Sequence, residues 1–519
     1  MQKNRSLIWI PIIFIGMMLL CLMILEFTMS LTDYNVLTPL YESSVVGLDN
    51  YITLFKQNDF LLTMGYSALL SVLMVLPSLL LGTGFSLLLG MIPLKPVKAA
   101  FAGGALLLAL VPADMWNHVI SLLSSFLFRA FPGYDSPLFR DYIPFLHEGI
   151  FTLANLFPMT SLSVFAGLTL SISNDIPAWK PALAFSLFPL LSLFLPHPNQ
   201  LSVFQNTIQL SSLQPTTFLY EQFAFSRYEF GFSSAISLFC RILSMLLGVF
   251  PALLISWASK RPASLPRRCD RDRRGYWGII AAVGTAILAA VVMLLLVWPC
   301  TMEISPTIGS RTLNTLITAL ITLPLAFGFC MLVITCSRKD HPFYSFGLLT
   351  ILLMLLSTFT VPGYLLMTHL DLLDTYAVIA LSALTHPIFL FVLILLAAQR
   401  PATWEKTVLL AFGGAFVAAA CCAGGLSTEK YLLFSDAKQT LNTAFASESI
   451  SVLRDRMFTF EFDQVYELSR YTNYFTIRFL KMLIPLVFAI PGIALVMGGV
   501  CGICADKPAP QGSSASSKA

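Results

Sequence analysis

Charged residues are scarce along this chain. Only 11% of its 519 residues are charged, whereas soluble domains carry about 25%, and 57% are hydrophobic. This deficit excludes an ordinary soluble domain and predicts an all-α polytopic membrane protein whose main partner is membrane lipid. The net charge of +4 comes from basic residues spread over short loops, so we expect no nucleic-acid partner.

Motifs that bind nucleotides or metals are also missing from the sequence. No GxxxxGK(S/T) loop occurs, so any ATPase must be a separate subunit, and no cofactor is expected in this chain. Cys501 and Cys504 form a CxxC pair, but the second pair that a zinc site needs is absent. No nucleophile or acid–base pair is assembled either, which argues against an enzyme. Other cysteines lie in or beside apolar runs and are interpreted as packing residues: Cys21, Cys240, Cys330, Cys336, Cys421 and Cys422.

Long apolar runs are abundant. Since about 20 apolar residues are needed per crossing, the sequence predicts about twelve transmembrane helices in two groups of six. The first run is too long for the apolar core of a signal peptide and is expected to be retained. The first group lies near 7–29, 62–91, 99–120, 149–171, 178–196 and 231–257. The second group lies near 276–298, 313–336, 344–368, 376–398, 406–425 and 478–503.

A basic stretch separates the two groups. Residues 260–274 contain seven Lys and Arg residues, and such residues mark cytoplasmic loops. The predicted units are a first transmembrane half (1–259), this linker, a second half (275–505) and a disordered tail (506–519). An even number of spans places both termini in the cytoplasm with the linker. The other loops on that side are also basic: Lys95 and Lys98, Lys180, Arg338 and Lys339, Arg400 and Lys406.

Several segments resemble one family of membrane proteins. In the first half these are GLDNY (47–51) with its flanks, ALVPADMW (109–116) and NLFPMTSLSVFAGL (155–168). In the second half they are RTLNTLITALITLPLAFGF (311–329), TVPGYLLMTHLDLLDTYAVIALSAL (360–384) and EKYLLFSDAKQTL (429–441). Together they are similar to the permeases of sugar-type ABC importers, the maltose- and glycerol-phosphate-like family. The resemblance covers about residues 25–425 and, more faintly, the remainder.

This resemblance implies two type I permease units fused in one chain of a bacterial plasma (inner) membrane. Such a chain would be the transmembrane part of a binding-protein-dependent importer for a sugar or related polar solute. It would move the solute by alternating access, with ATP hydrolysed on separate nucleotide-binding subunits and with an extracytoplasmic solute-binding protein as a further partner.

The chain departs from the family where the ATPase docks. Family members carry a cytoplasmic loop with an EAA signature between their fourth and fifth spans. Here only TLSISND (169–175) precedes IPAWKP (176–181), and QRPATWEK (399–406) joins the equivalent spans of the second half. Both coupling loops are therefore interpreted as deleted, the alternative being that a divergent loop lies elsewhere.

Polar residues within spans are the candidate substrate pathway, because such residues usually face a partner or a cavity. Asp114, Asn117 and His118 follow Pro112 at helical spacing and predict one polar face, although an interfacial cluster is the alternative. Glu26 and Arg241 are interpreted as structural, either paired within the first bundle or reaching an interface. The remaining pathway candidates and predicted helix breaks are Trp116, Asn155 with Pro158, Pro362 with Gly363, and His386 with Pro387.

Three functions therefore compete. An importer permease is the first, and a permease-like membrane scaffold or sensor without ATPase coupling is the second. A secondary transporter of the major facilitator type is the third, since it shares the six-plus-six layout. The second-to-third-span loop MIPLKPVKAAF (91–101) disfavours the third, because it lacks that family's Gly/Asp/Arg signature.

Overall fold

The computed structural model of the protein describes most of the apolar part of the chain. The described residues are 5–35, 40–56, 58–111, 158–174, 176–188, 229–259, 287, 306–337, 343–356, 366–368, 370–401, 403–425, 435–441 and 472–501. Regular structure within these ranges is helical, apart from one isolated antiparallel bridge between Thr32 and Val45. The linker 260–274 and the tail 506–519 lie outside the described residues.

Six named α-helices and one further helical stretch make up the described part of the first half. They are α1 (Trp9–Ser30), α2 (Asp49–Lys56), α3 (Asn58–Gly90), α4 (Lys95–Leu110), residues 158–174, α7 (Trp179–Ser186) and α10 (Phe230–Ala258). The 3-10 helices η1 (Arg5–Ile8) and η2 (Leu40–Glu42) precede α1 and α2.

The second half begins, within the described residues, with the long helix α12 (Pro306–Ser337). It continues with α13 (Phe343–Leu355), α15 (Tyr376–Ala383), α16 (Pro387–Ala398), α17 (Trp404–Gly424), the 3-10 helix η5 (Asp436–Lys438) and α22 (Thr472–Cys501).

The protein is a multi-pass membrane protein. In the described part, five helices are long and apolar enough to cross a bilayer, and the bent pair α15 and α16 makes a sixth span if counted together. The five lie at Trp9–Ser30, Phe230–Ala258, Ile308–Ser337, Trp404–Gly424 and Phe479–Val500. Shorter apolar stretches within α3 and α13 add to these.

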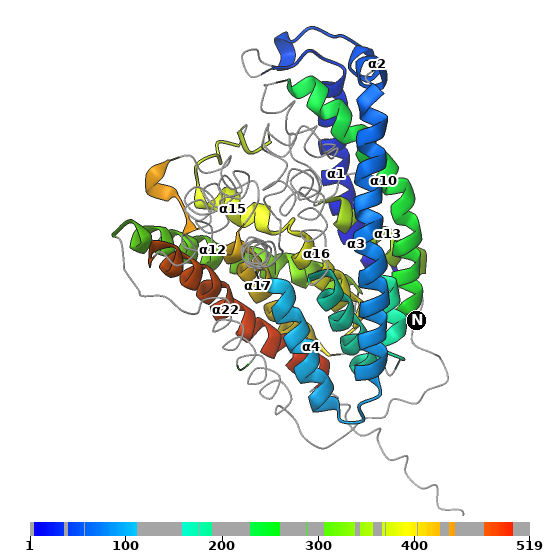
Figure 1. Ribbon diagram of the computed structural model, residues 1–519, viewed down its shortest axis with the longest axis vertical. Helices are drawn as coiled ribbons and strands as arrows, with labels where there is room; N and C mark the ends of the chain where they lie inside the picture. Colours follow the sequence, from blue (N-terminus) through cyan, green and yellow to red (C-terminus); the bar gives the residue numbers. More distant parts are fainter. Residues whose placement is uncertain are drawn as a thin grey trace, which may run out of the picture.

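The two halves repeat the same packing pattern. In each, the second predicted span packs against the fifth, as α3 does with α7 and α12 with α17. The fifth packs against the sixth, as α7 does with α10 and α17 with α22. Figure 1 shows α1, α3 and α10 running along one side of the molecule, and α12, α17 and α22 inclined to them.

Each half also packs one of its helices against the other half. The third predicted span of each half packs against the sixth of the other: α4 against α22, and α13 against α10. Further contacts across the halves join α1 to α13 and place the Phe185 and Phe391 rings 4.9 Å apart. One continuous hydrophobic core cluster consequently includes residues of both halves. Equivalent helices of the two halves thus make reciprocal contacts across the molecule.

Glycine residues allow neighbouring helices to pack closely. A Cβ atom on Gly167 would lie 2.6 Å from the carbonyl oxygen of Ala178, and one on Gly413 would lie 2.7 Å from Cγ2 of Val496. Real Cβ atoms do not approach other atoms so closely, so glycine is required at both positions. Small residues at helix contacts are how membrane helices gain packing energy without a hydrophobic driving force between them.

The observed helices correct several predicted boundaries. Residues 169–174 of the segment interpreted as a connection are helical and continue the fourth span, so the connection itself is shorter than predicted. The span predicted at 376–398 is two helices bent by 49°. The span predicted at 344–368 begins with α13, which ends at Leu355, and residues 357–365 lie outside the described part.

Six cysteines of the described apolar helices are free thiols, and five of these six are buried as the sequence predicted; Cys21 is exposed.

Candidate functional site

Most of the predicted pathway residues lie outside the described residues. They are Asp114, Trp116, Asn117, His118, Asn155, Pro112, Pro362 and Gly363. The residues just before Pro112 belong to the described part: α4 ends at Leu110, and Val111 has φ −59° and ψ 127°. This extended backbone is the conformation favoured before a proline. Pro158 is the first described residue of the helix 158–174, and it is buried.

The predicted break at His386 and Pro387 is confirmed. α15 ends at Ala383 and α16 begins at Pro387, where a missing backbone N–H costs nothing in the first turn. His386 occupies the N-cap position, and its Nδ1 accepts a hydrogen bond from the backbone N–H of Ile388 at 3.3 Å. The histidine is therefore a capping residue, which explains its position without a role in binding.

A buried ion pair joins the first and last spans of the first half. The Arg241 guanidinium on α10 contacts the Glu26 carboxylate on α1, and the two side chains are 1% and 0% exposed. Arg241 Nη2 also donates a hydrogen bond to Ser237 Oγ at 2.9 Å. Of the two alternatives that the sequence left open, pairing within the bundle is the one observed. A fully buried ion pair is costly to insert, so each charge depends on the other.

The segment after α1 is fixed to the end of that helix. Asn50 on α2 donates hydrogen bonds from Nδ2 to the carbonyl oxygens of Ser30 at 2.9 Å and Thr32 at 3.0 Å. The Tyr51 hydroxyl donates to Ser30 Oγ at 2.7 Å. Burial raises the pKa of Tyr51, and the hydrogen bond to Ser30 lowers it by a smaller amount. The phenol therefore stays protonated and keeps this bond at physiological pH.

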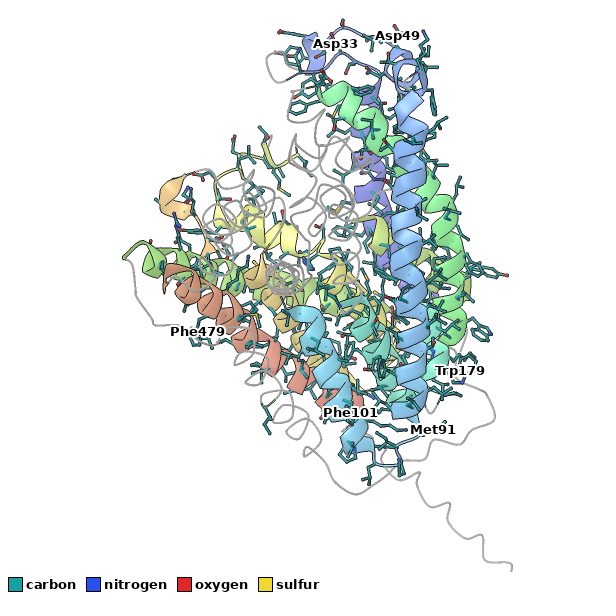
Figure 2. The ribbon with its side chains drawn as sticks, in the orientation of Figure 1. Asp33, Asp49, Met91, Phe101, Trp179 and Phe479 are labelled. Atoms are coloured by element: carbon teal, nitrogen blue, oxygen red, sulfur yellow. The ribbon has the colours of Figure 1, made fainter. Side chains whose placement is uncertain are left out.

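These contacts place α2 at one end of the bundle. Figure 2 shows Asp33 and Asp49 together at one extremity of the molecule, and Met91, Phe101 and Trp179 at the opposite end. The segment that contains GLDNY (47–51) thus continues into α2, which packs against α10 and leads directly into α3.

A polar cluster in the second half centres on Asn314, near the start of α12. Its Nδ2 donates hydrogen bonds at 2.9 Å to the carbonyl oxygens of Ala437 and of Gln439. Its Oδ1 accepts a 2.8 Å hydrogen bond from the Tyr376 hydroxyl on α15. Thr315 Oγ1, beside it, accepts the backbone N–H of Leu441 at 3.1 Å. The segment 435–441 is thereby tied across two helices.

An ion pair reinforces the same segment. Lys438 Nζ lies 3.2 Å from Asp374 Oδ2, and Asp374 Oδ1 accepts the backbone N–H of Ser435 at 3.0 Å. Asp374 has φ 56°, a left-handed conformation that aspartate tolerates better than most residues. The sequence analysis missed this cluster; an asparagine among apolar residues in RTLNTL (311–316) is the signal that could have indicated it.

The connections between the helices predicted as the fourth and fifth spans are very short. In the first half only residues 175–178 separate helix 158–174 from α7, and in the second half only 399–403 separate α16 from α17. A surface helix of two turns needs about seven residues at 3.6 per turn, besides the turns that flank it. Neither connection can therefore form the helix on which an ATPase subunit of the resembled family docks.

Comparison of the chain with protein-family models, with curated protein sequences and with solved structures found no match. Within the described residues, no group of three or more His, Cys, Asp or Glu side chains is arranged to hold a metal ion.

Proposed function

We propose that this chain is the permease component of a binding-protein-dependent ABC importer, carrying two type I permease units in one polypeptide. Its solute would be a sugar or a related polar molecule, taken up across a bacterial inner membrane. Both termini and the linker 260–274 would face the cytoplasm, and the six helices of each half would make twelve crossings in total. The proposal rests on the family resemblance of both halves.

The observation that carries this proposal is the reciprocal packing of equivalent helices. An importer of this kind needs two permease units around one pathway, and here α4 and α13 each cross to the opposite half. Because a helix of each half packs against the other half, we expect the two halves to move together. A change at the inner ends of one half would be transmitted to the other, as alternating access requires.

The proposed pathway includes the polar residues after Pro112. α4, which precedes these residues in the chain, packs against α22 of the second half. In this proposal Asp114, Asn117 and His118 provide hydrogen bonds to solute hydroxyls, and Trp116 provides an aromatic surface, with Asn155 as a further contact. Changing Asp114 to Asn or His118 to Ala should reduce uptake while the folded protein is retained.

A second candidate is favoured by the short connections between the helices predicted as the fourth and fifth spans. Residues 175–178 and 399–403 leave no space for a docked coupling helix, so the chain can serve as a permease-like scaffold or sensor that binds an external solute-binding protein without ATPase coupling. In an importer, the ATPase would have to contact the linker or the short basic loops instead. Such contacts are electrostatic and weaken with salt.

Purification in mild detergent separates the candidates. The tagged chain is isolated from its own membranes at low and at high salt, and the bound proteins are identified. A nucleotide-binding subunit that is present at least at low salt supports the importer. Recovery of a solute-binding protein alone supports the scaffold. Recovery of neither partner under any condition contradicts both functions.

A further inference from the structure

Tryptophan side chains mark one end of the helical bundle. Four tryptophans are described, and each lies at a helix terminus: Trp9, Trp179 and Trp404 are the first residues of α1, α7 and α17, and Trp257 is next to the last residue of α10. The sequence predicts the cytoplasmic side for all four of these ends. Their side chains are between 41% and 55% exposed, so none is a core residue. Exposed tryptophans at one level of a bundle are typical of a membrane–water interface.

A lysine is held within this group of tryptophans. Lys180 Nζ lies 3.8 Å from the centre of the Trp257 ring, which joins the start of α7 to the end of α10. Trp179, beside Lys180, is 41% exposed, and Trp257 is 44% exposed. The ammonium group is thus restrained by a cation–π contact between two helix ends that carry exposed tryptophans.

We infer that Lys180, Trp179 and Trp257 form a binding site for the headgroup of an anionic phospholipid. The ring of Trp257 restrains the lysine and lowers the entropy that it loses on binding a phosphate. The exposed faces of both rings contact the glycerol and upper acyl region, where indoles preferentially reside. The charge of Lys180 favours an anionic headgroup over a zwitterionic one, because the latter carries no net charge.

Native mass spectrometry of the full-length protein tests this site. Phosphatidylglycerol or phosphatidylcholine is titrated into the detergent-purified protein, and bound lipid is counted. A lysine near an anionic lipid surface contributes about a fivefold gain in affinity. K180Q should therefore weaken phosphatidylglycerol binding roughly fivefold at this site and leave phosphatidylcholine binding unchanged. W257A should weaken phosphatidylglycerol binding as well, because it removes the ring that restrains the lysine.

K56Q is the matched control, since Lys56 is an exposed lysine at the end of α2 on the opposite side of the protein. The inference is overturned if K180Q binds phosphatidylglycerol as tightly as the wild type, or if K56Q weakens it equally. It is also overturned if inorganic phosphate alone displaces phosphatidylglycerol at comparable concentration, because the site would then bind phosphate without its lipid. If the W257A variant does not fold, the phosphatidylglycerol binding of K180Q alone decides the question.

Discussion

Replacing Arg241 by alanine should destabilise the first half strongly at neutral pH. The substitution leaves the Glu26 carboxylate 0% exposed and without the guanidinium that it contacts. Removing one partner of a buried ion pair typically costs about 3–5 kcal/mol, because the remaining charge is uncompensated. The protein can limit this cost only by protonating the carboxyl group.

The cost of protonating the carboxyl group sets this limit. For a carboxyl group with an ordinary pKa of about 4.3, protonation costs about 3.7 kcal/mol at pH 7, since each pH unit above the pKa costs about 1.36 kcal/mol. At pH 5 the same protonation costs only about 1 kcal/mol. The penalty of R241A should therefore fall from about 3.7 to about 1 kcal/mol between these two pH values.

Two comparison variants make the test specific. E26A leaves a guanidinium, which stays charged at both pH values, so its penalty should not be relieved by acid. The apolar double variant E26L/R241M removes both charges, and its stability should lie near or above that of the wild type. The free energy of unfolding is measured by steric trapping in lipid bicelles at pH 7 and pH 5. An R241A penalty that is equal at the two pH values would refute the reasoning. So would a double variant whose loss in the free energy of unfolding equals the sum of the losses in the two single variants.

Three further outcomes are expected. G231A should lower the thermal unfolding temperature, because its Cβ would lie 2.1 Å from a backbone oxygen, whereas G65A should not, since nothing lies within 4 Å of that position. N314A should accelerate hydrogen exchange at 435–441, because it removes two hydrogen bonds to that segment; unchanged exchange there would contradict its assigned role. Cys269, in the basic linker, should react with an impermeant thiol reagent only from the cytoplasmic side, and labelling from outside would invert the proposed topology.

The positions of the long helices were predictable from apolar runs. The spans expected at 7–29 and 231–257 are observed as Trp9–Ser30 and Phe230–Ala258. Their agreement follows from bilayer thickness, which fixes how many apolar residues a crossing needs. The break before Pro387 was predictable for an equally local reason, because proline lacks the N–H that a continuous helix would use there.

Polar residues in helices were harder to interpret. TLSISND (169–175) resembles a loop in composition, yet its first six residues are helical. Hydroxyl groups in an apolar helix can hydrogen-bond to the backbone of the preceding turn, as Ser173 does to the carbonyl oxygen of Leu170 at 3.4 Å. Their presence therefore does not end a helix inside a membrane.

Contacts between distant residues could not be predicted from one sequence. The two backbone carbonyls that Asn314 contacts lie 123 and 125 residues away, and nothing local to either segment specifies the pairing. The ion pair of Glu26 and Arg241 could not be predicted either. The two roles considered for these residues, pairing within the bundle and reaching an interface, differ only in tertiary structure. The proposed pathway around Asp114 remains a prediction, because those residues lie outside the described ranges.

The reciprocal packing of the two halves is the central structural claim, and disulfide cross-linking in native membranes tests it most directly. A Cβ atom on Gly347 of α13 would lie 3.6 Å from Leu253 Cδ2 of α10, across the two halves. With a protease site placed in the linker 260–274, L253C/G347C should hold the cleaved halves together on a non-reducing gel until a reductant is added. The pair L246C/G347C is the control, because Leu246 is 67% exposed on the same helix and should not cross-link. Halves that separate for L253C/G347C as readily as for the control would contradict the account.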